Sequence, residues 1–184
     1  MGNELKLIII TGLPGSGKTS IARVLQHTLN LPLISKDSIK EVLFDELGYS
    51  GRDWSKKIGQ ATFALMDVQI KELLSRHVSI IVEANFKPDF DSEKFQSWID
   101  TYNCSAIQIV CKADNEVLFD RFRQRALAGE RHPGHDDVNQ LEKWRAYFSD
   151  PELQALPLGI TSKVIEVDTS NFDAIPTETI LKQI

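Results

Sequence analysis

The hydrophobic positions of the chain fall into two patterns, continuous runs and helical stripes. Five short runs rich in isoleucine and valine are typical of parallel strands that are buried on both faces; they cover residues 5–10, 32–35, 78–82, 105–110 and 164–167. Between the runs, apolar residues recur every three or four positions, which indicates amphipathic helices. The predicted helices cover residues 18–30, 38–47, 54–76, 88–102, 115–128, 137–148 and 177–184. This alternation predicts a three-layer α/β fold, in which helices cover both faces of a five-stranded parallel sheet.

Length and composition fit one globular domain. The chain has 184 residues, of which 42% are hydrophobic and 26% are charged, so we expect a single domain over residues 1–184 with a sizeable core. The formal net charge of −5 argues against nucleic acid as the partner, because binding a long polyanion relies on many Lys and Arg contacts. A local basic patch stays open as an alternative.

The spacing of the two cysteines indicates in which cellular compartment the protein works. Cys104 and Cys111 flank one predicted strand and lie seven positions apart. At about 3.3 Å per residue this separation is beyond the reach of a disulfide, so we expect reduced thiols and a cytoplasmic protein. The apolar runs are too short to span a bilayer. We therefore expect no membrane partner, and a monomer or a homodimer.

The segment that follows the first predicted strand, Gly-Leu-Pro-Gly-Ser-Gly-Lys-Thr, fits the phosphate-binding pattern G-x-x-x-x-G-K-[ST] at every fixed position. Glycines let the backbone curl so that successive N–H groups point at phosphate oxygens, and the next helix adds the partial positive charge of its N-terminus. We expect Lys18 to reach the β- and γ-phosphates as a catalytic residue, and the Thr19 hydroxyl to ligate Mg²⁺. The expected nucleotide contacts are Gly12, Leu13, Pro14, Gly15, Ser16, Gly17, Lys18, Thr19 and Ser20.

Further short motifs follow in an order that resembles one group of proteins. They are Lys36-Asp37 after the second predicted strand, Glu83-Ala84-Asn85 after the third, and Arg121-x-x-x-Arg125 on a late helix. With the phosphate-binding loop, they resemble the small P-loop kinases that include phage-type polynucleotide 5′-hydroxyl kinase, zeta-toxin-like kinases and chloramphenicol phosphotransferase. The resemblance covers about residues 5–170. It implies a nucleoside-monophosphate-kinase-like core, the use of ATP and Mg²⁺, phosphorylation of a hydroxyl group, and an adenine pocket lined by residues 169–171.

The resemblance gives roles to three polar residues at the ends of strands. Asp37 lies where the group has a carboxylate near the acceptor hydroxyl, which can accept the proton and orient the nucleophile; the alternative is an N-cap of a helix that begins at Ser38. Glu83 is expected to hold a water ligand of Mg²⁺ or to bind the acceptor; the alternative is a solvated strand end. Asn85 is expected to contact the acceptor, with ordinary turn chemistry as the alternative.

A basic segment follows on the late helix. Arg121 and Arg125 are four positions apart, so they share one helix face and repel each other unless an anion lies between them. Arginines on that face can stabilise the γ-phosphate during transfer, so we expect Arg121 to bind nucleotide and Arg125 to be catalytic. Arg131, expected to bind substrate, completes what resembles a mobile lid over about residues 121–148. The alternative is a solvated basic face that pairs with Asp120 and Glu130.

Two histidines, His132 and His135, flank Pro133-Gly134 in this segment. They predict a lid turn that contacts substrate or nucleotide, and a metal site is the less favoured alternative because Cys partners are absent. The sequence as a whole predicts an ATP- and Mg²⁺-dependent phosphotransferase that acts on a hydroxyl group of a small molecule. The alternatives are a polynucleotide 5′-hydroxyl kinase and a P-loop ATPase or nucleotide sensor without a phosphate acceptor.

Overall fold

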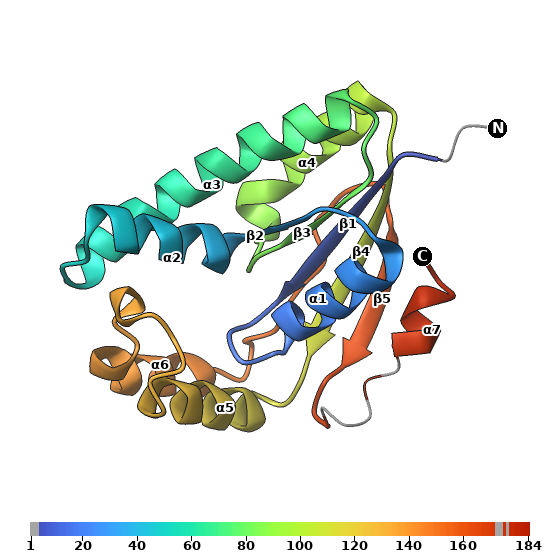
Figure 1. Ribbon diagram of the computed structural model, residues 1–184. Helices are drawn as coiled ribbons and strands as arrows, with labels where there is room; N and C mark the ends of the chain where they lie inside the picture. Colours follow the sequence, from blue (N-terminus) through green and yellow to red (C-terminus); the bar gives the residue numbers. More distant parts are fainter. Residues whose placement is uncertain (1–3, 172–174, 176) are drawn as a thin grey trace.

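The computed structural model describes residues 4–171, 175 and 177–184. Its sheet contains five parallel strands in the order β2-β3-β1-β4-β5 (Figure 1). The strands are β1 (Lys6–Gly12), β2 (Leu33–Ser35), β3 (Ile80–Glu83), β4 (Ser105–Lys112) and β5 (Lys163–Asp168). The predicted parallel sheet is therefore confirmed. In such a sheet the carboxyl ends of the strands meet at one edge, which is where ligands bind.

Helices lie on both faces of the sheet (Figure 1). They are α1 (Lys18–Leu29), α2 (Lys36–Leu47), α3 (Gly51–Ser75), α4 (Pro88–Tyr102), α5 (Asn115–Leu127), α6 (Leu141–Phe148) and α7 (Thr177–Leu181). Two short 3₁₀ helices, η1 (Pro133–His135) and η2 (Val138–Gln140), lie between α5 and α6. Helices α3 and α4 pack on one face, while α1 and α7 pack on the other.

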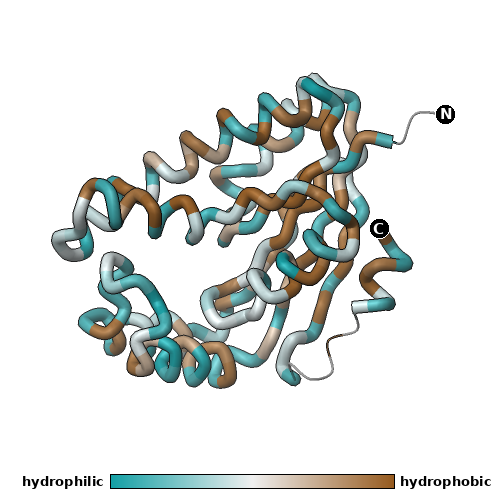
Figure 2. Tube along the Cα trace, viewed as in Figure 1, coloured by the Kyte–Doolittle hydropathy of each residue, from teal (hydrophilic) through white to brown (hydrophobic). Residues whose placement is uncertain are grey.

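Strand β1 shows why the apolar runs are continuous. Leu7 and Ile9 pack against α3 and α4, whereas Ile8 and Ile10 pack against α1 on the opposite face. All four side chains are fully buried, because each face of the sheet is covered by helices. Figure 2 shows this concentration of hydrophobic positions in the central strands.

The segment from α5 to α6 has a small hydrophobic cluster of its own. Leu118 and Phe122 of α5 pack against Phe148 and Trp144 of α6, and Leu13 of the phosphate-binding loop joins them. The segment is thus a semi-independent layer beside the carboxyl edge of the sheet (Figure 1). The cluster therefore joins the α5–α6 segment to the phosphate-binding loop.

Several predicted boundaries differ from the structure, and three of the differences lie near the carboxyl edge of the sheet. The helix expected from residue 38 begins at Lys36, and the helix expected over 137–148 is divided into η2 and α6. The segment expected as a loop, 129–136, contains η1, where Gly134 packs on Phe44 so closely that a Cβ would lie 2.5 Å from the ring. Contact between α2 and this turn therefore determines a conformation that local pattern does not predict. In the part of the chain that the structure describes, no helix is both long and apolar enough to cross a membrane.

Candidate active site

The phosphate-binding loop connects β1 to α1 at the centre of the sheet. Gly15 and Gly17 adopt φ angles of 84° and 73°, which side-chain-bearing residues rarely take. The loop also packs on α5, because a Cβ on Gly15 would lie 2.5 Å from the carbonyl oxygen of Leu118. The Ser16 hydroxyl is buried and has no hydrogen-bond partner among the described residues. A curled backbone with an unsatisfied buried hydroxyl fits a loop that binds an anion.

Glu83 lies beside this loop at the end of β3. Its side chain is 2% exposed, and one carboxylate oxygen accepts a hydrogen bond of 2.7 Å from the Ser35 hydroxyl. The other oxygen lies 4.0 Å from the Lys18 Nζ. The alternative of a solvated strand end is therefore wrong. Glu83 connects the carboxyl ends of β2 and β3 to the lysine of the phosphate-binding loop.

Asp37 lies in the first turn of α2, directly after β2. The helix begins at Lys36 and its N-cap is Ser35, so the alternative that Asp37 caps a helix starting at Ser38 is wrong. The cause is that the helix starts as soon as β2 ends, which leaves Asp37 inside the first turn rather than in front of it. Its carboxylate is held by Lys36 at 3.7 Å and by Arg131 at 2.7 Å.

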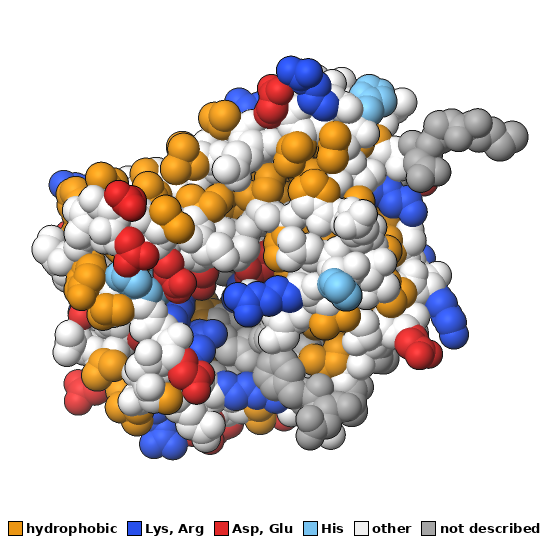
Figure 3. Space-filling model, viewed as in Figure 1, with side chains coloured by type: hydrophobic (Ala, Val, Ile, Leu, Met, Phe, Trp, Pro, Cys, Tyr) orange, Lys and Arg blue, Asp and Glu red, His pale blue; other side chains and the backbone are white. Residues whose placement is uncertain are grey.

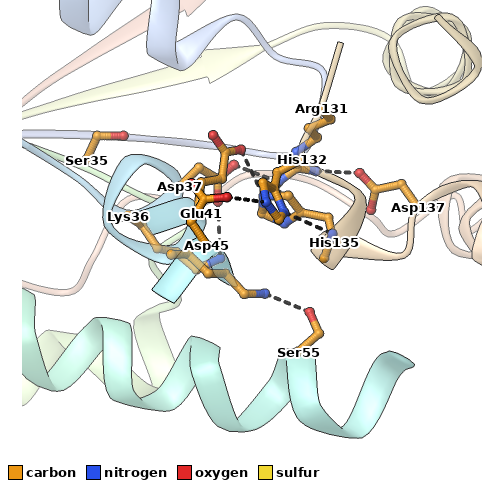
Figure 4. Close-up of polar contacts among 12 residues, drawn as sticks. Ser35, Lys36, Asp37, Glu41, Asp45, Ser55, Arg131, His132, His135 and Asp137 are labelled. Carbon is orange, nitrogen blue, oxygen red and sulfur yellow. Dashed lines mark hydrogen bonds and ion pairs between the residues drawn. The ribbon is translucent and has the colours of Figure 1, made fainter. Parts of the chain in front are cut away.

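Arg131 connects the α5–α6 segment to α2 (Figure 4). One of its terminal nitrogens donates to Asp37 at 2.7 Å, and the other donates to Asp137 at 2.8 Å. The Arg131 side chain is 16% exposed, so the alternative of a solvated basic face is wrong for it. That alternative fits Arg123 instead, which is half exposed and pairs with Asp120 at 3.3 Å.

The two histidines contact acidic residues of α2. Arg131 donates to His135 Nδ1 at 3.2 Å, so the proton of the neutral ring is assigned to Nε2, which donates to Glu41 at 3.0 Å. His132 Nε2 lies 3.0 Å from an Asp45 carboxylate oxygen. Figure 4 shows these side chains pointing toward one another across the boundary between the α5–α6 segment and α2.

The contacts between the α5–α6 segment and α2 control the ionisation of Asp37 and His135. Burial alone raises the pKa of the Asp37 carboxyl, but the charges of Arg131 and Lys36 outweigh burial and hold the pKa well below its usual range. Burial, together with the charge of Arg131, lowers the pKa of His135 to about 3. Asp37 is therefore an anion and His135 a neutral ring at pH 7.

The two arginines of α5 have different surroundings, although they are four positions apart. Arg121 donates hydrogen bonds of 2.8 Å to the carbonyl oxygens of Thr169 and Ser170, in the loop after β5. Arg125 faces the interior, and its buried Nε has no hydrogen-bond partner among the described residues. Arg125 thus offers a donor to an anion, while Arg121 supports the loop that was expected to line an adenine pocket.

One cavity of about 500 Å³ brings most of the expected site residues together. Lys18, Thr19, Asp37, Glu83, Asn85, Arg125 and Arg131 all line it. Arg121 is not among its lining residues. Figure 3 shows Lys and Arg side chains gathered around a hollow on this face. The volume is typical of a site for small molecules.

Many residues of the cavity were not found by sequence reasoning, among them Lys40, Arg52, Ser55, Gly59 and Trp144. Isolated residues on helices give no signal of their own. A signal did exist for the α2 contacts, because Asp37, Glu41 and Asp45 recur at intervals of four, which places three carboxylates on one helix face. Such a stripe predicts a basic partner, and Arg131 with the two histidines supplies it.

The donor set suits Mg²⁺ held together with phosphates. Thr19 and Glu83 offer hard oxygen ligands beside the phosphate-binding loop, and Mg²⁺ is commonly held by one or two such groups plus substrate phosphates. Among the described residues, no group of three or more His, Cys, Asp and Glu side chains could hold a metal ion by itself.

Comparison with known proteins places the chain in a family. Residues 7–151 match the model of the AAA_33 family, described as an AAA domain, so the chain belongs to this family. Over 98% of its length it is similar to a protein of Chloroflexus aurantiacus J-10-fl described as a candidate kinase, with 33% identity, 97% of that chain covered and a TM-score of 0.86. Family, fold and glycine loop together define a small kinase-like P-loop NTPase.

Two further similarities are more limited. The chain is 29% identical to the shikimate kinase of Enterococcus faecalis over 77 residues, which cover 42% of this chain and 44% of that protein. It thus spans less than half of the length of this curated relative. The structure described as the Pnkp1/Rnl/Hen1 complex matches 66% of this chain and 40% of that one, with 20% identity and a TM-score of 0.51. That similarity is one of fold alone.

Proposed function

We propose that the protein is an ATP- and Mg²⁺-dependent phosphotransferase that moves the γ-phosphate of ATP to a hydroxyl group of a small molecule. The observation that carries the proposal is that Asp37 and the phosphate-binding Lys18 line the same cavity of about 500 Å³. An ATPase or nucleotide sensor needs the lysine but has no need of an ionised carboxylate across the cavity from it. The volume favours a compact acceptor over a polynucleotide strand.

In this proposal, residues 12–20 hold the phosphates of ATP, Thr19 ligates Mg²⁺, and Glu83 holds one of its water ligands. Bound ATP supplies the phosphoryl group, and Mg²⁺ neutralises charge on its oxygens. Lys18 and Arg125 stabilise negative charge where the γ-phosphate is transferred. Arg121 acts on the nucleotide from the other side, through the loop at Thr169 and Ser170.

Asp37 orients the acceptor hydroxyl by accepting its hydrogen bond. Its pKa lies below the usual range because of Arg131 and Lys36, so it is a weak proton acceptor in the ground state. Phosphoryl transfer through a loose transition state requires the hydroxyl proton to leave late, and a carboxylate of this kind meets that requirement. Arg131 and Asn85 are the proposed further contacts to the acceptor.

We also propose that about residues 121–148 act as a lid. Arg131, His132 and His135 fasten this segment to α2 through carboxylates, and closure excludes water from the bound γ-phosphate.

The thiols of Cys104 and Cys111 are buried and free, and burial raises the pKa of Cys111 to about 12. Unreactive thiols of this kind support the proposal of a cytoplasmic protein.

The test is acceptor-dependent turnover of ATP. Sugars, polyols, hydroxy acids, nucleosides, antibiotics and 5′-hydroxyl oligonucleotides are screened, and ADP release is measured with and without each compound. Slow turnover alone and fast turnover with one class of small alcohol is the expected result. Turnover that no acceptor accelerates would favour the ATPase, and efficient labelling of oligonucleotides would favour the polynucleotide kinase.

A further inference from the structure

A buried lysine stands beside the proposed acceptor position without a carboxylate partner. Lys40 of α2 is 7% exposed, and its Nζ donates to the Ser55 hydroxyl of α3 at 2.9 Å. The same nitrogen lies 5.1 Å from the centre of the Phe44 ring. Among the described residues, it forms no ion pair with an acidic side chain. A hydroxyl and an aromatic face are weak compensation for a buried charge.

Other cations surround Lys40 from two helices. Lys36 precedes it by one helical turn, and Arg52 of α3 lines the same cavity. Burial, and then the charge of Lys36, lowers the pKa of Lys40 to about 8. The site therefore holds positive charge at an energetic cost, and an anion would remove that cost.

The nearby carboxylates are already engaged. Asp37 is shared between Arg131 at 2.7 Å and Lys36 at 3.7 Å. Glu41 accepts from His135 at 3.0 Å. Neither forms an ion pair with Lys40, and the charge of Asp37 only partly offsets burial and the neighbouring cations, so the pKa of Lys40 is still lowered. An anion from outside the chain would complete the compensation.

Gly59 has no side chain and therefore leaves space in the cavity next to Lys40. Gly59 of α3 lines the cavity beside Lys40, and a Cβ on it would lie 3.8 Å from the Lys40 Nζ. Lys40 and Asp37 are three positions apart on α2, so their Cβ atoms are about 5–6 Å apart on one helix face. One small molecule can therefore contact both side chains.

We infer that the acceptor carries an anionic group, which Lys40 binds together with Lys36 and Arg52 while Asp37 contacts the hydroxyl that is phosphorylated. The acceptor class is a compact hydroxy acid or a phosphate ester of a small alcohol. Carboxylate and phosphate share the chemistry that this cluster recognises, namely charge-assisted hydrogen bonding to ammonium and guanidinium groups. This inference rests on the proposed function, because it concerns the acceptor end of the same cavity.

The first experiment measures anion binding without needing the true acceptor. A non-hydrolysable ATP analogue with Mg²⁺ first fills the phosphate-binding loop, and inorganic phosphate or acetate is then titrated by calorimetry. Lys40→Met should weaken binding about tenfold or more, and Arg52→Gln a few-fold, while Lys57→Met, an exposed lysine of α3, should leave binding unchanged. Preference for phosphate would indicate a phosphate ester, and preference for acetate a hydroxy acid.

Equal anion affinity in the unmodified protein and in the Lys40→Met and Arg52→Gln variants, or no binding of either anion, would overturn the inference. Arg52 is exposed, so its variant keeps the test valid even if Lys40→Met fails to fold. ADP release with glycerol, glycerate and glycerol 3-phosphate separates the two proposals. Transfer to neutral glycerol that ignores Lys40 would leave a kinase without an anion subsite. Lys40-dependent anion binding without transfer to any compound of the wider screen would leave the subsite and remove the kinase.

Discussion

The two sides of the cavity are built in different ways. On the side proposed to bind the nucleotide, the loop after β1 has two glycines at positive φ, and its Pro14, Lys18 and Thr19 line the cavity. On the side proposed to bind the acceptor, charged side chains from α2, α3 and the α5–α6 segment meet through ion pairs and hydrogen bonds. A backbone cradle suits one ligand group shared by all nucleoside triphosphates, whereas a side-chain site can change its ligand by single substitutions.

The nucleotide side should be broken most completely by one substitution. Lys18→Ala removes the charge proposed to face the β- and γ-phosphates, and it also leaves the buried Glu83 without the cation 4.0 Å away. We expect phosphoryl transfer to fall below detection, measured as ADP release with the acceptor found in the screen. Lys57→Ala, a change of the same kind on the exposed face of α3, should keep full activity. Full activity of Lys18→Ala would remove the P-loop kinase proposal.

Substitution of Arg125, which lies between the two sides of the cavity, should lower activity nearly as much. Arg125→Ala deletes a half-buried arginine whose buried Nε has no partner in the described residues. We expect kcat to fall by about 10²–10⁵-fold with the fold intact, as when an arginine that stabilises the transition state is removed.

Arg123→Ala is the matched control for this change. Arg123 is two positions away on the same helix, and its contact is the exposed pair with Asp120. It should keep kcat within about twofold, because exposed ion pairs contribute little. Loss of thermal stability without loss of kcat in Arg125→Ala would show that the arginine is structural.

Asp37→Asn tests the proposed role of this carboxylate toward the acceptor hydroxyl. The amide keeps the shape of the side chain and can still accept from Arg131, so we expect unfolding free energy to fall by about 1–3 kcal/mol. Transfer to the acceptor should fall by about 10²–10⁴-fold, while the affinity for the ATP analogue, measured by calorimetry, stays near that of the unmodified protein.

Asp45→Asn tests whether any carboxylate of α2 has this effect. Asp45 contacts the α5–α6 segment through His132, two helical turns beyond Asp37. Because its side chain is 67% exposed, its replacement should change transfer only slightly. Equal losses in both variants would assign Asp37 to lid docking rather than to the acceptor hydroxyl.

The same division explains what the sequence could predict. Continuous apolar runs and the glycine pattern are local signals, so the sheet and the loop of residues 12–19 follow from them directly. Glu83 and Asp37 follow predicted strands whose carboxyl ends meet at one edge of the sheet, and the family resemblance supplies their expected roles. The loop, the sheet and these strand ends thus required no knowledge of which helices meet.

Lys40 and Ser55 could not be predicted in this way, because their partnership exists only once α2 packs on α3. Glu41 and Asp45 belong to a stripe of carboxylates that the sequence shows on one helix face. Their partners, His135 and His132, lie some 90 positions further along the chain, so the sequence does not show the pairing. The helix start was misplaced for a related reason. An Asp after a strand is typical of an N-cap, and only the contact with Arg131 shows that its carboxylate is used elsewhere.

The smallest effect we expect is a pH dependence of stability that arises where the proposed lid contacts α2. In the unfolded chain, the pKa of a histidine is about 6.5, whereas burial and Arg131 lower that of His135 to about 3. Between these values the unfolded chain binds more protons at this residue, so the free energy of unfolding falls as the pH is lowered. One such group contributes a slope of at most about 1.4 kcal/mol per pH unit.

His135→Gln should flatten that slope between about pH 6 and pH 4.5, a window chosen from the two pKa values of His135 and above the range where unfolded aspartates titrate. Glutamine keeps a donor for Glu41 but cannot titrate, so the difference isolates the ring. Unfolding by urea is measured at several pH values. His132→Gln is the control, because its partner Asp45 is exposed and the contact should matter little. If the slopes of the unmodified protein and His135→Gln coincide, His135 is not held neutral in the folded protein. The contacts of His135 with Arg131 and Glu41 would then be weaker in solution than their distances imply.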